Sequence, residues 1–193
     1  MNSIIPLLKN QDYIEDVRVY NGEDVDYDLN SYLFIKFLIE TRQVDTPPMT
    51  IVDYMLLSFG LRGIDHSKRW VKPVPPIHLG DRDIAVHLSP RYLNDRVVWG
   101  DILRPVADRI FFVGLRSEWV DFCRYSGMRL PYVPTNDFLE LQGVLEGATR
   151  MYCGAGGPHA LAEAIKMPIS LAIADSHDCL FERDGVEYIL SYD

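Results

Sequence analysis

The sequence predicts an α/β fold in which helices cover both faces of a parallel β-sheet. The first observation is that, after residue 83, short apolar runs alternate with helical stretches of about 10–14 residues. The second is that these runs lack the polar alternation of a strand with one solvated face, which indicates strands buried on both faces. Together, the two observations predict a Rossmann-like layer in the second half of the chain.

The predicted elements of this layer follow one another in a regular order. Pro105 is expected to bend or shorten the first helix, and Thr135 is expected to cap the third helix with help from Asp137. Near the end, Asp184-Gly185 predicts a hairpin turn or an added edge strand. Strands are expected at residues 83–89, 110–115, 129–134, 150–154 and 168–174, with helices between them at residues 99–109, 117–127, 135–148 and 157–167.

A proline-rich stretch at residues 71–82 marks the predicted domain boundary, because prolines remove backbone donors and favour an extended connector. Residues 83–193 are predicted to form the Rossmann-like nucleotide-binding domain. Residues 1–70 are predicted to be a small accessory or bridging segment. Within that segment we expect a short helix at residues 4–11, a strand at 17–20, a helix or strand at 29–40 and a helix at 46–61.

Composition excludes several classes of protein. The net charge of −9 and a pI near 5.0 argue against a nucleic-acid partner, which requires a basic face. Cys123, Cys153 and Cys179 have neither the spacing of a zinc site nor an even number for a disulfide framework, so reduced cysteines and no metal are expected. The N-terminus lacks a signal-peptide pattern and no apolar run reaches membrane-span length, so a cytoplasmic protein is expected.

The stretch "CGAGGPH" joins the strand at 150–154 to the next helix and is the strongest candidate site. Gly154, Gly156 and Gly157 permit positive φ and close approach of a ligand to the backbone. Pro158 presets the helix, whose N-terminus is an anion site. In a doubly wound sheet this loop faces the loop after the first strand, where Arg91 could hold a phosphate.

A simpler interpretation of the same residues stays open. The glycines could serve only a tight strand-to-helix turn, His159 could only pack or cap the helix, and Arg91 could be a solvated loop charge. His87 lies inside the first strand and is assigned to core packing rather than to metal binding.

Three motifs resemble the C-terminal half of heptosyltransferase-like GT-B glycosyltransferases, as found in bacteria and phages. They are "FFVGLRSEW", the helix "DFLELQGVLEGA" and "GGPH" followed by "ALAEAIKMPI". The resemblance covers residues 83–175 well and residues 3–40 faintly. It implies that Gly156, Gly157 and His159 contact the diphosphate of a nucleotide-activated sugar, and that the backbone of Gly114 and Leu115 lines the nucleotide. It also implies metal-independent glycosyl transfer, with the nucleotide sugar as substrate and no cofactor.

Two departures from the family pattern shape the functional hypotheses. The family's serine before "GPxH" is Gly156 here, and its N-terminal Rossmann domain has no counterpart. A catalytic base would therefore be Asp95, Glu118 or a group from elsewhere, and a homo-oligomer or second subunit would complete the cleft. The alternatives are a degenerate GT-B half that acts as a non-catalytic binding or viral assembly module in the host cytoplasm, and a sugar-nucleotide epimerase of related fold.

Overall fold

The protein divides into two compact units. The computed structural model describes residues 4–26, 28, 30, 32–41, 51–61, 65–172 and 183–189. Unit 1 comprises residues 1–18, 67–175 and 183–193, and unit 2 comprises residues 19–66 and 176–182. Unit 2 contains two helices that pack on one another, α2 (Tyr32–Glu40) and α3 (Ile51–Ser58). The predicted domain boundary at 71–82 lies inside unit 1, and the start of the predicted accessory segment belongs to unit 1 as well.

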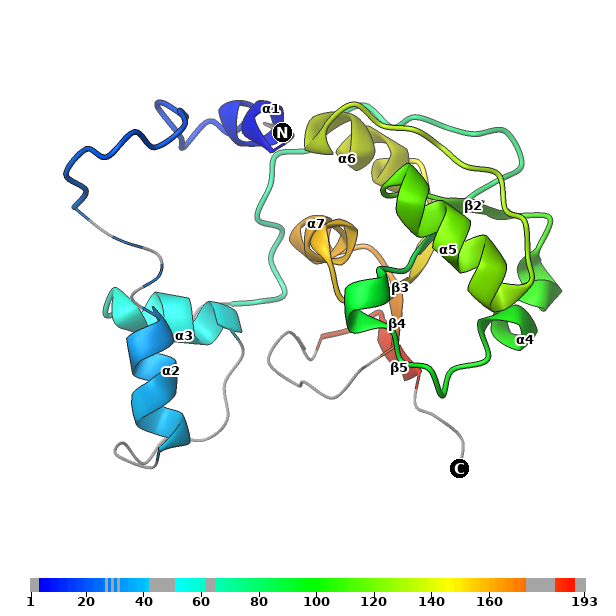
Figure 1. The fold of residues 1–193 in the computed structure, drawn as a ribbon. Helices are drawn as coiled ribbons and strands as arrows, with labels where there is room; N and C mark the ends of the chain where they lie inside the picture. The colour runs from blue at the N-terminus through cyan, green and yellow to red at the C-terminus, as the bar shows by residue number, and fades with distance from the viewer. Residues whose placement is uncertain are drawn as a thin grey trace. The chain divides into compact units, whose positions relative to one another are not determined.

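Unit 1 is built on a five-stranded parallel sheet in the order β2-β1-β3-β4-β5 (Figure 1). Outside β2, Tyr132 forms an isolated parallel bridge with Phe112, so the predicted third strand at 129–134 is reduced to this bridge. Counting it, the spatial order is that of the Rossmann fold, with the reversal between β1 and β3. The predicted parallel α/β architecture is confirmed. The strands are β1 (Ile84–His87), β2 (Ile110–Phe112), β3 (Arg150–Gly154), β4 (Ile169–Ala172) and β5 (Val186–Ile189).

The described part of unit 1 contains five α-helices. In the first predicted helix, the α-helical part ends at Leu103 and is followed by a 3-10 turn that contains Pro105. The helix is therefore shortened at its proline, as expected. Thr135 does not cap α6, because the Asp137 carboxylate accepts the amide protons of Leu139 and Glu140 at 2.9 Å each. The helices are α1 (Ile5–Lys9), α4 (Trp99–Leu103), α5 (Arg116–Ser126), α6 (Phe138–Glu146) and α7 (Gly157–Ile165), with 3-10 turns at η2 (Pro90–Tyr92) and η3 (Arg104–Val106).

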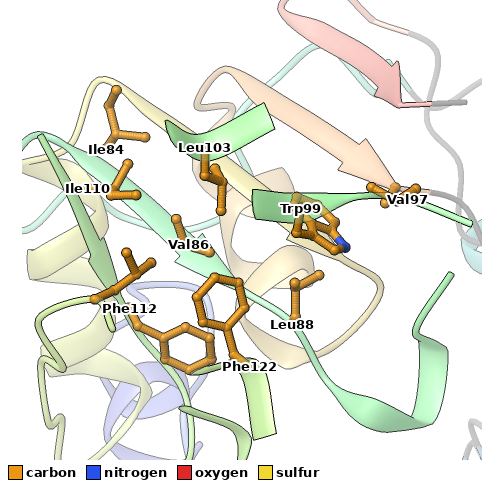
Figure 2. Packing of buried hydrophobic residues seen from close by; sticks show 11 residues of the cluster. Ile84, Val86, Leu88, Val97, Trp99, Leu103, Ile110, Phe112 and Phe122 are labelled. Atoms are coloured by element: carbon orange, nitrogen blue, oxygen red, sulfur yellow. The ribbon is translucent and has the colours of Figure 1, made fainter. Parts of the chain in front are cut away.

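One face of the sheet packs against α4 and α5. Alternate strand residues such as Val86 and Phe112 point to this side, where Trp99 and Phe122 from the two helices meet them (Figure 2). The rings of Phe112 and Phe122 lie 5.4 Å apart, a favourable separation for an aromatic pair. Because the pleat turns the intervening residues to the other side, the strands must be apolar on both faces, which explains their unbroken apolar runs.

The opposite face of the sheet is covered by α6 and α7, which pack on one another, with α1 beside α6. Met151 and Cys153 of β3 are fully buried, and burial raises the pKa of the Cys153 thiol far above its ordinary value. Cys153 and the half-buried Cys123 are both free thiols, as expected, and Cys179 lies outside the described residues.

Much of the proline-rich segment is hydrogen-bonded to α6. We call residues 69–78, over which the chain runs extended, the strap. The amide of Gln142 donates to the carbonyl of Lys72 at 2.7 Å, and the amide of Ile77 donates to the carbonyl of Gly143 at 2.8 Å. The strap is therefore part of the folded unit, which explains why the predicted connector falls inside unit 1.

Replacing Gly147 by alanine is expected to displace the strap. An added Cβ would lie 2.3 Å from the carbonyl oxygen of Ile77, and this contact is with backbone that cannot rotate away. Overpacking of this kind costs about 1–3 kcal/mol of the free energy of unfolding. Urea denaturation measures the loss, with Ala107→Ser, which also adds one heavy atom at an exposed site, as the control. A loss equal to that of the control would contradict the contact.

Of the remaining predictions of secondary structure, some are confirmed and one is wrong. Residues 17–20 form no strand, while within the stretch 29–40 the described residues Tyr32–Glu40 form the helix α2. Residues 186–189 form β5, an edge strand parallel to β4, so the edge addition is confirmed. The segment that would pair with it in a hairpin begins outside the described residues. Arg150 of β3 bonds Glu187 of β5 at 2.5 Å and links the sheet to this edge.

Candidate functional site

A cavity of about 360 Å³ opens at the carboxyl ends of β1 and β3. This is the point at which the strand order reverses, where doubly wound sheets collect their ligands. The volume falls in the range of small-molecule sites. The lining residues come from the end of β1, from the loops after β1, β2, the Tyr132 bridge and β3, and from the first turns of α5, α6 and α7. They are His87, Ser89, Arg91, Gly114, Leu115, Glu118, Thr135, Asn136, Asp137, Phe138, Leu141, Gly156, Gly157 and Pro158. A second cavity of about 290 Å³ adjoins it and shares Ser89 and Glu118.

The glycines of the cavity are required mainly by space. A Cβ on Gly156 would lie 3.0 Å from Nε2 of His87, and one on Gly157 would lie 2.8 Å from the ring of Phe138. Of the predicted site glycines, only Gly114 has a left-handed backbone, with φ of 126°. The left-handed backbone that glycine permits is therefore not used at Gly154, Gly156 or Gly157. Gly156 and Gly157 instead allow the chain to approach neighbouring side chains closely.

Three helix N-termini line this cavity, and two of them are already occupied by carboxylates of the chain. At α5, Oε2 of Glu118 accepts the amide proton of Leu115 at 2.8 Å. At α6, Asp137 caps the first turn as described above. At α7, the N-cap is Gly156 and no side chain caps the helix. The first N–H groups of α7, which belong to Gly157 and His159 because Pro158 has none, therefore have no intrahelical carbonyl, and they carry the positive end of the helix dipole.

His87 forms part of the cavity wall and is 1% exposed. Its Nδ1 lies 3.1 Å from the carbonyl oxygen of Val113 and 3.9 Å from Oε2 of Glu118. Since a carbonyl only accepts, Nδ1 carries the proton and Nε2 has a lone pair. Among the described residues, Nε2 has no hydrogen-bond partner. Burial lowers the pKa of His87, while the Glu118 charge and the Val113 carbonyl act in the opposite direction.

The predicted site residues separate into two groups. Arg91, Gly114, Leu115, Gly156 and Gly157 all line the cavity. The structure thus brings together residues that are up to 66 positions apart in the chain, as between Arg91 and Gly157.

Gly154 and His159 lie outside the lining. Gly154 ends β3, buried and in register with Ala172. His159 is 4% exposed in the first turn of α7, with Nε2 4.0 Å from Oε1 of Glu163. Burial, together with the charges of His87 and Arg183, lowers the pKa of His159 to about 4. His159 is therefore a neutral, buried side chain at neutral pH.

The two candidate bases are placed differently. Glu118 lines the cavity, but its carboxylate is held by the Leu115 amide. Asp95 is exposed and absent from the lining of both cavities, and its carbonyl accepts a hydrogen bond from the Tyr125 hydroxyl at 3.2 Å. Neither carboxylate is therefore placed as an unengaged base in the cavity.

Sequence reasoning missed His87, Asn136 and Phe138 as cavity residues. His87 was assigned to the core, which its burial supports, but the pleat also directs its Nε2 towards Gly156. The available signal was that His87 lies near the carboxyl end of the predicted first strand, close to the loop that faces the reversal point.

In the described part of the chain, no three histidine, cysteine or acidic side chains form a metal-binding group. No helix among the described residues is long and apolar enough to cross a membrane. Comparisons with protein-family models, with curated proteins and with solved structures found no match to this chain.

Proposed function

We propose that the chain binds the diphosphate of a nucleotide-activated sugar in the cavity between β1 and β3. The observation that carries this proposal is the uncapped N-terminus of α7, which opens on the cavity at the reversal of the strand order. Amide groups and a helix dipole at such an end favour a phosphate group. The sugar nucleotide, as the class of ligand, is what the resemblance to GT-B glycosyltransferases implies.

Charge supports the same position for the anion. Glu118 and Asp137 occupy the ends of α5 and α6, so an incoming anion is repelled there and attracted to α7. Arg91, from the loop after β1, lines the same cavity. A guanidinium group can hold a phosphate with two parallel hydrogen bonds, which would anchor the ligand from the side facing α7.

If the chain is active, the reaction is metal-independent glycosyl transfer. The α7 amides and Arg91 would stabilise the charge that develops on the leaving nucleotide diphosphate. The base that activates the acceptor would come from a second copy or another subunit, since neither Asp95 nor Glu118 is an unengaged base in the cavity. That placement favours the second candidate, a binding module that holds the nucleotide sugar without catalysis.

Titration calorimetry with UDP-glucose, ADP-glucose and the corresponding nucleoside diphosphates tests the binding. Replacing Arg91 by alanine is expected to weaken binding by about 10–100-fold, the value of one charge-assisted hydrogen-bonded contact. Arg96→Ala removes an exposed arginine of the same loop that does not line the cavity and should leave the affinity unchanged. No heat with any of these ligands, or equal losses in the two variants, would contradict the proposed site.

Turnover separates the two candidates. The wild-type protein is mixed with a nucleotide sugar that it binds and with a panel of sugar and lipid acceptors. The release of nucleoside diphosphate is then measured. Release above the rate without protein supports a glycosyltransferase. Binding without release supports the non-catalytic module.

A further inference from the structure

We propose that His87 is a direct ligand of the bound diphosphate and binds it in the protonated form, so that each anion bound takes up one proton. This inference rests on the proposed function, because it concerns the same cavity. It adds a phosphate ligand that the sequence motifs did not identify. It also makes the affinity for the ligand depend on pH.

The geometry places Nε2 of His87 beside the anion site. A Cβ on Gly156 would lie 3.0 Å from this nitrogen, and Gly156 is the N-cap residue of α7. Gly156 leaves that space open, so an anion seated on the first amides of α7 would lie next to Nε2. Among the described residues Nε2 has no other partner. A buried nitrogen without a partner is costly unless a ligand satisfies it.

In the neutral histidine, that contact would be repulsive. Nδ1 donates to Val113, so Nε2 presents a lone pair to a phosphate oxygen that is itself an acceptor. A proton taken from solvent onto Nε2 converts it to a donor. The imidazolium then donates to both Val113 and the phosphate, and its charge offsets one charge of the diphosphate.

The groups around His87 allow this one protonation. From α5, Glu118 lies 3.9 Å from Nδ1 and favours the imidazolium. On α7, His159 stays neutral because its pKa is lowered to about 4. Glu163 lies next to His159, and its carboxylate is paired with Arg183. Arg91 of η2 and Asp137, the N-cap residue of α6, line the same cavity with opposite charges.

The sign of the pH dependence follows from the linkage. Burial lowers the pKa of His87 in the free protein, and a bound dianion raises it. The affinity is therefore highest below the free pKa and falls by about tenfold per pH unit up to the bound pKa. Above the bound pKa the affinity is again constant, at its lower value.

Calorimetry on the wild-type protein measures the proton directly. UDP-glucose and ADP-glucose are suitable probes, because their diphosphate diester does not titrate between about pH 5 and 8. The heat is measured near neutral pH in two buffers of different ionisation enthalpy, and its dependence on that enthalpy gives the protons taken up. An uptake approaching one proton supports the inference. Binding with no uptake and a flat pH profile overturns it and leaves the proposed function standing, whereas no binding overturns both.

The variant His87→Gln tests whether His87 is the residue that takes up the proton. In His87→Gln the side-chain amide donates without being protonated, so binding is expected to persist with no proton uptake. His78→Gln, which removes an exposed histidine of the strap, is expected to keep the uptake. Persistent uptake in the His87 variant would overturn the inference. Thermal unfolding checks that the His87→Gln variant is folded. If it is not folded, the number of protons taken up by the wild-type protein on binding decides whether the inference holds.

Discussion

Replacing Glu163 by glutamine is expected to lower the free energy of unfolding by about 3–5 kcal/mol, because it leaves buried cations without their counter-charge. The Glu163 side chain is 1% exposed and that of Arg183 is 5% exposed. Nε of Arg183 donates to Oε2 of Glu163 at 2.7 Å, and Nζ of Lys166 lies 3.8 Å from the same oxygen. Glutamine has nearly the same volume, so the loss reports charge rather than a cavity.

This arrangement ties α7 to the segment that leads into β5. Glu163 belongs to α7, Lys166 is its C-cap residue, and Arg183 precedes the edge strand β5. Arg183 also donates to the carbonyl of Met167 at 2.8 Å. Loss of the carboxylate would therefore loosen the attachment of β5 as well as α7.

Denaturant unfolding followed by circular dichroism measures the effect. Asp101→Asn removes the carboxylate of an exposed pair with Arg104, whose groups are 3.5 Å apart and largely exposed, and should change stability by less than about 0.5 kcal/mol. The double replacement Glu163→Met with Arg183→Met should recover part of the loss, because it removes the Arg183 charge together with the carboxylate, while Lys166 keeps its charge. If Glu163→Gln lowered the free energy of unfolding as little as Asp101→Asn does, this would contradict the buried ionic contacts of Glu163 with Arg183 and Lys166.

Replacing Gly114 by alanine is expected to destabilise the protein by about 2–5 kcal/mol and to abolish ligand binding. The backbone at Gly114 has φ of 126°, which an L side chain rarely adopts. The added Cβ would lie 2.7 Å from Nδ1 of His87 and 2.8 Å from Oε2 of Glu118. Both of these side chains are held by backbone hydrogen bonds, to Val113 and Leu115, so neither can move without losing one.

Gly127 provides the matched control for this variant. Its φ is 68° and no atom lies within 4 Å of an added Cβ, so Gly127→Ala reports strain alone, about 1 kcal/mol. The difference between the two unfolding free energies isolates the clash at the cavity. Calorimetry with UDP-glucose and ADP-glucose then tests binding, which Gly127→Ala should retain. Equal losses of stability in the two variants would show that His87 and Glu118 do not crowd Gly114.

Much of the sheet was predictable because its signals are local. Strand–helix alternation and unbroken apolar runs predict a doubly covered parallel sheet, since burial on both faces leaves no room for polar residues in the strands. The same logic placed the cavity at the strand reversal, with Arg91, Gly156 and Gly157 in its lining, whereas Gly114 and Leu115 were implied by the family resemblance. The prediction of a short strand at residues 17–20 was wrong, because apolar character over four residues is too weak a signal to require pairing with another strand.

The sequence by itself determined the parallel α/β sheet and the glycine-rich strand-to-helix turn that opens on its reversal point. Only the tertiary structure decided that His87 faces Gly156 while His159 is turned into a buried contact with Glu163. It also decided that α7 alone, of the three helices that begin at the cavity, lacks a side-chain cap. Side-chain direction and capping depend on register and on contacts between residues distant in the chain, which local patterns do not encode.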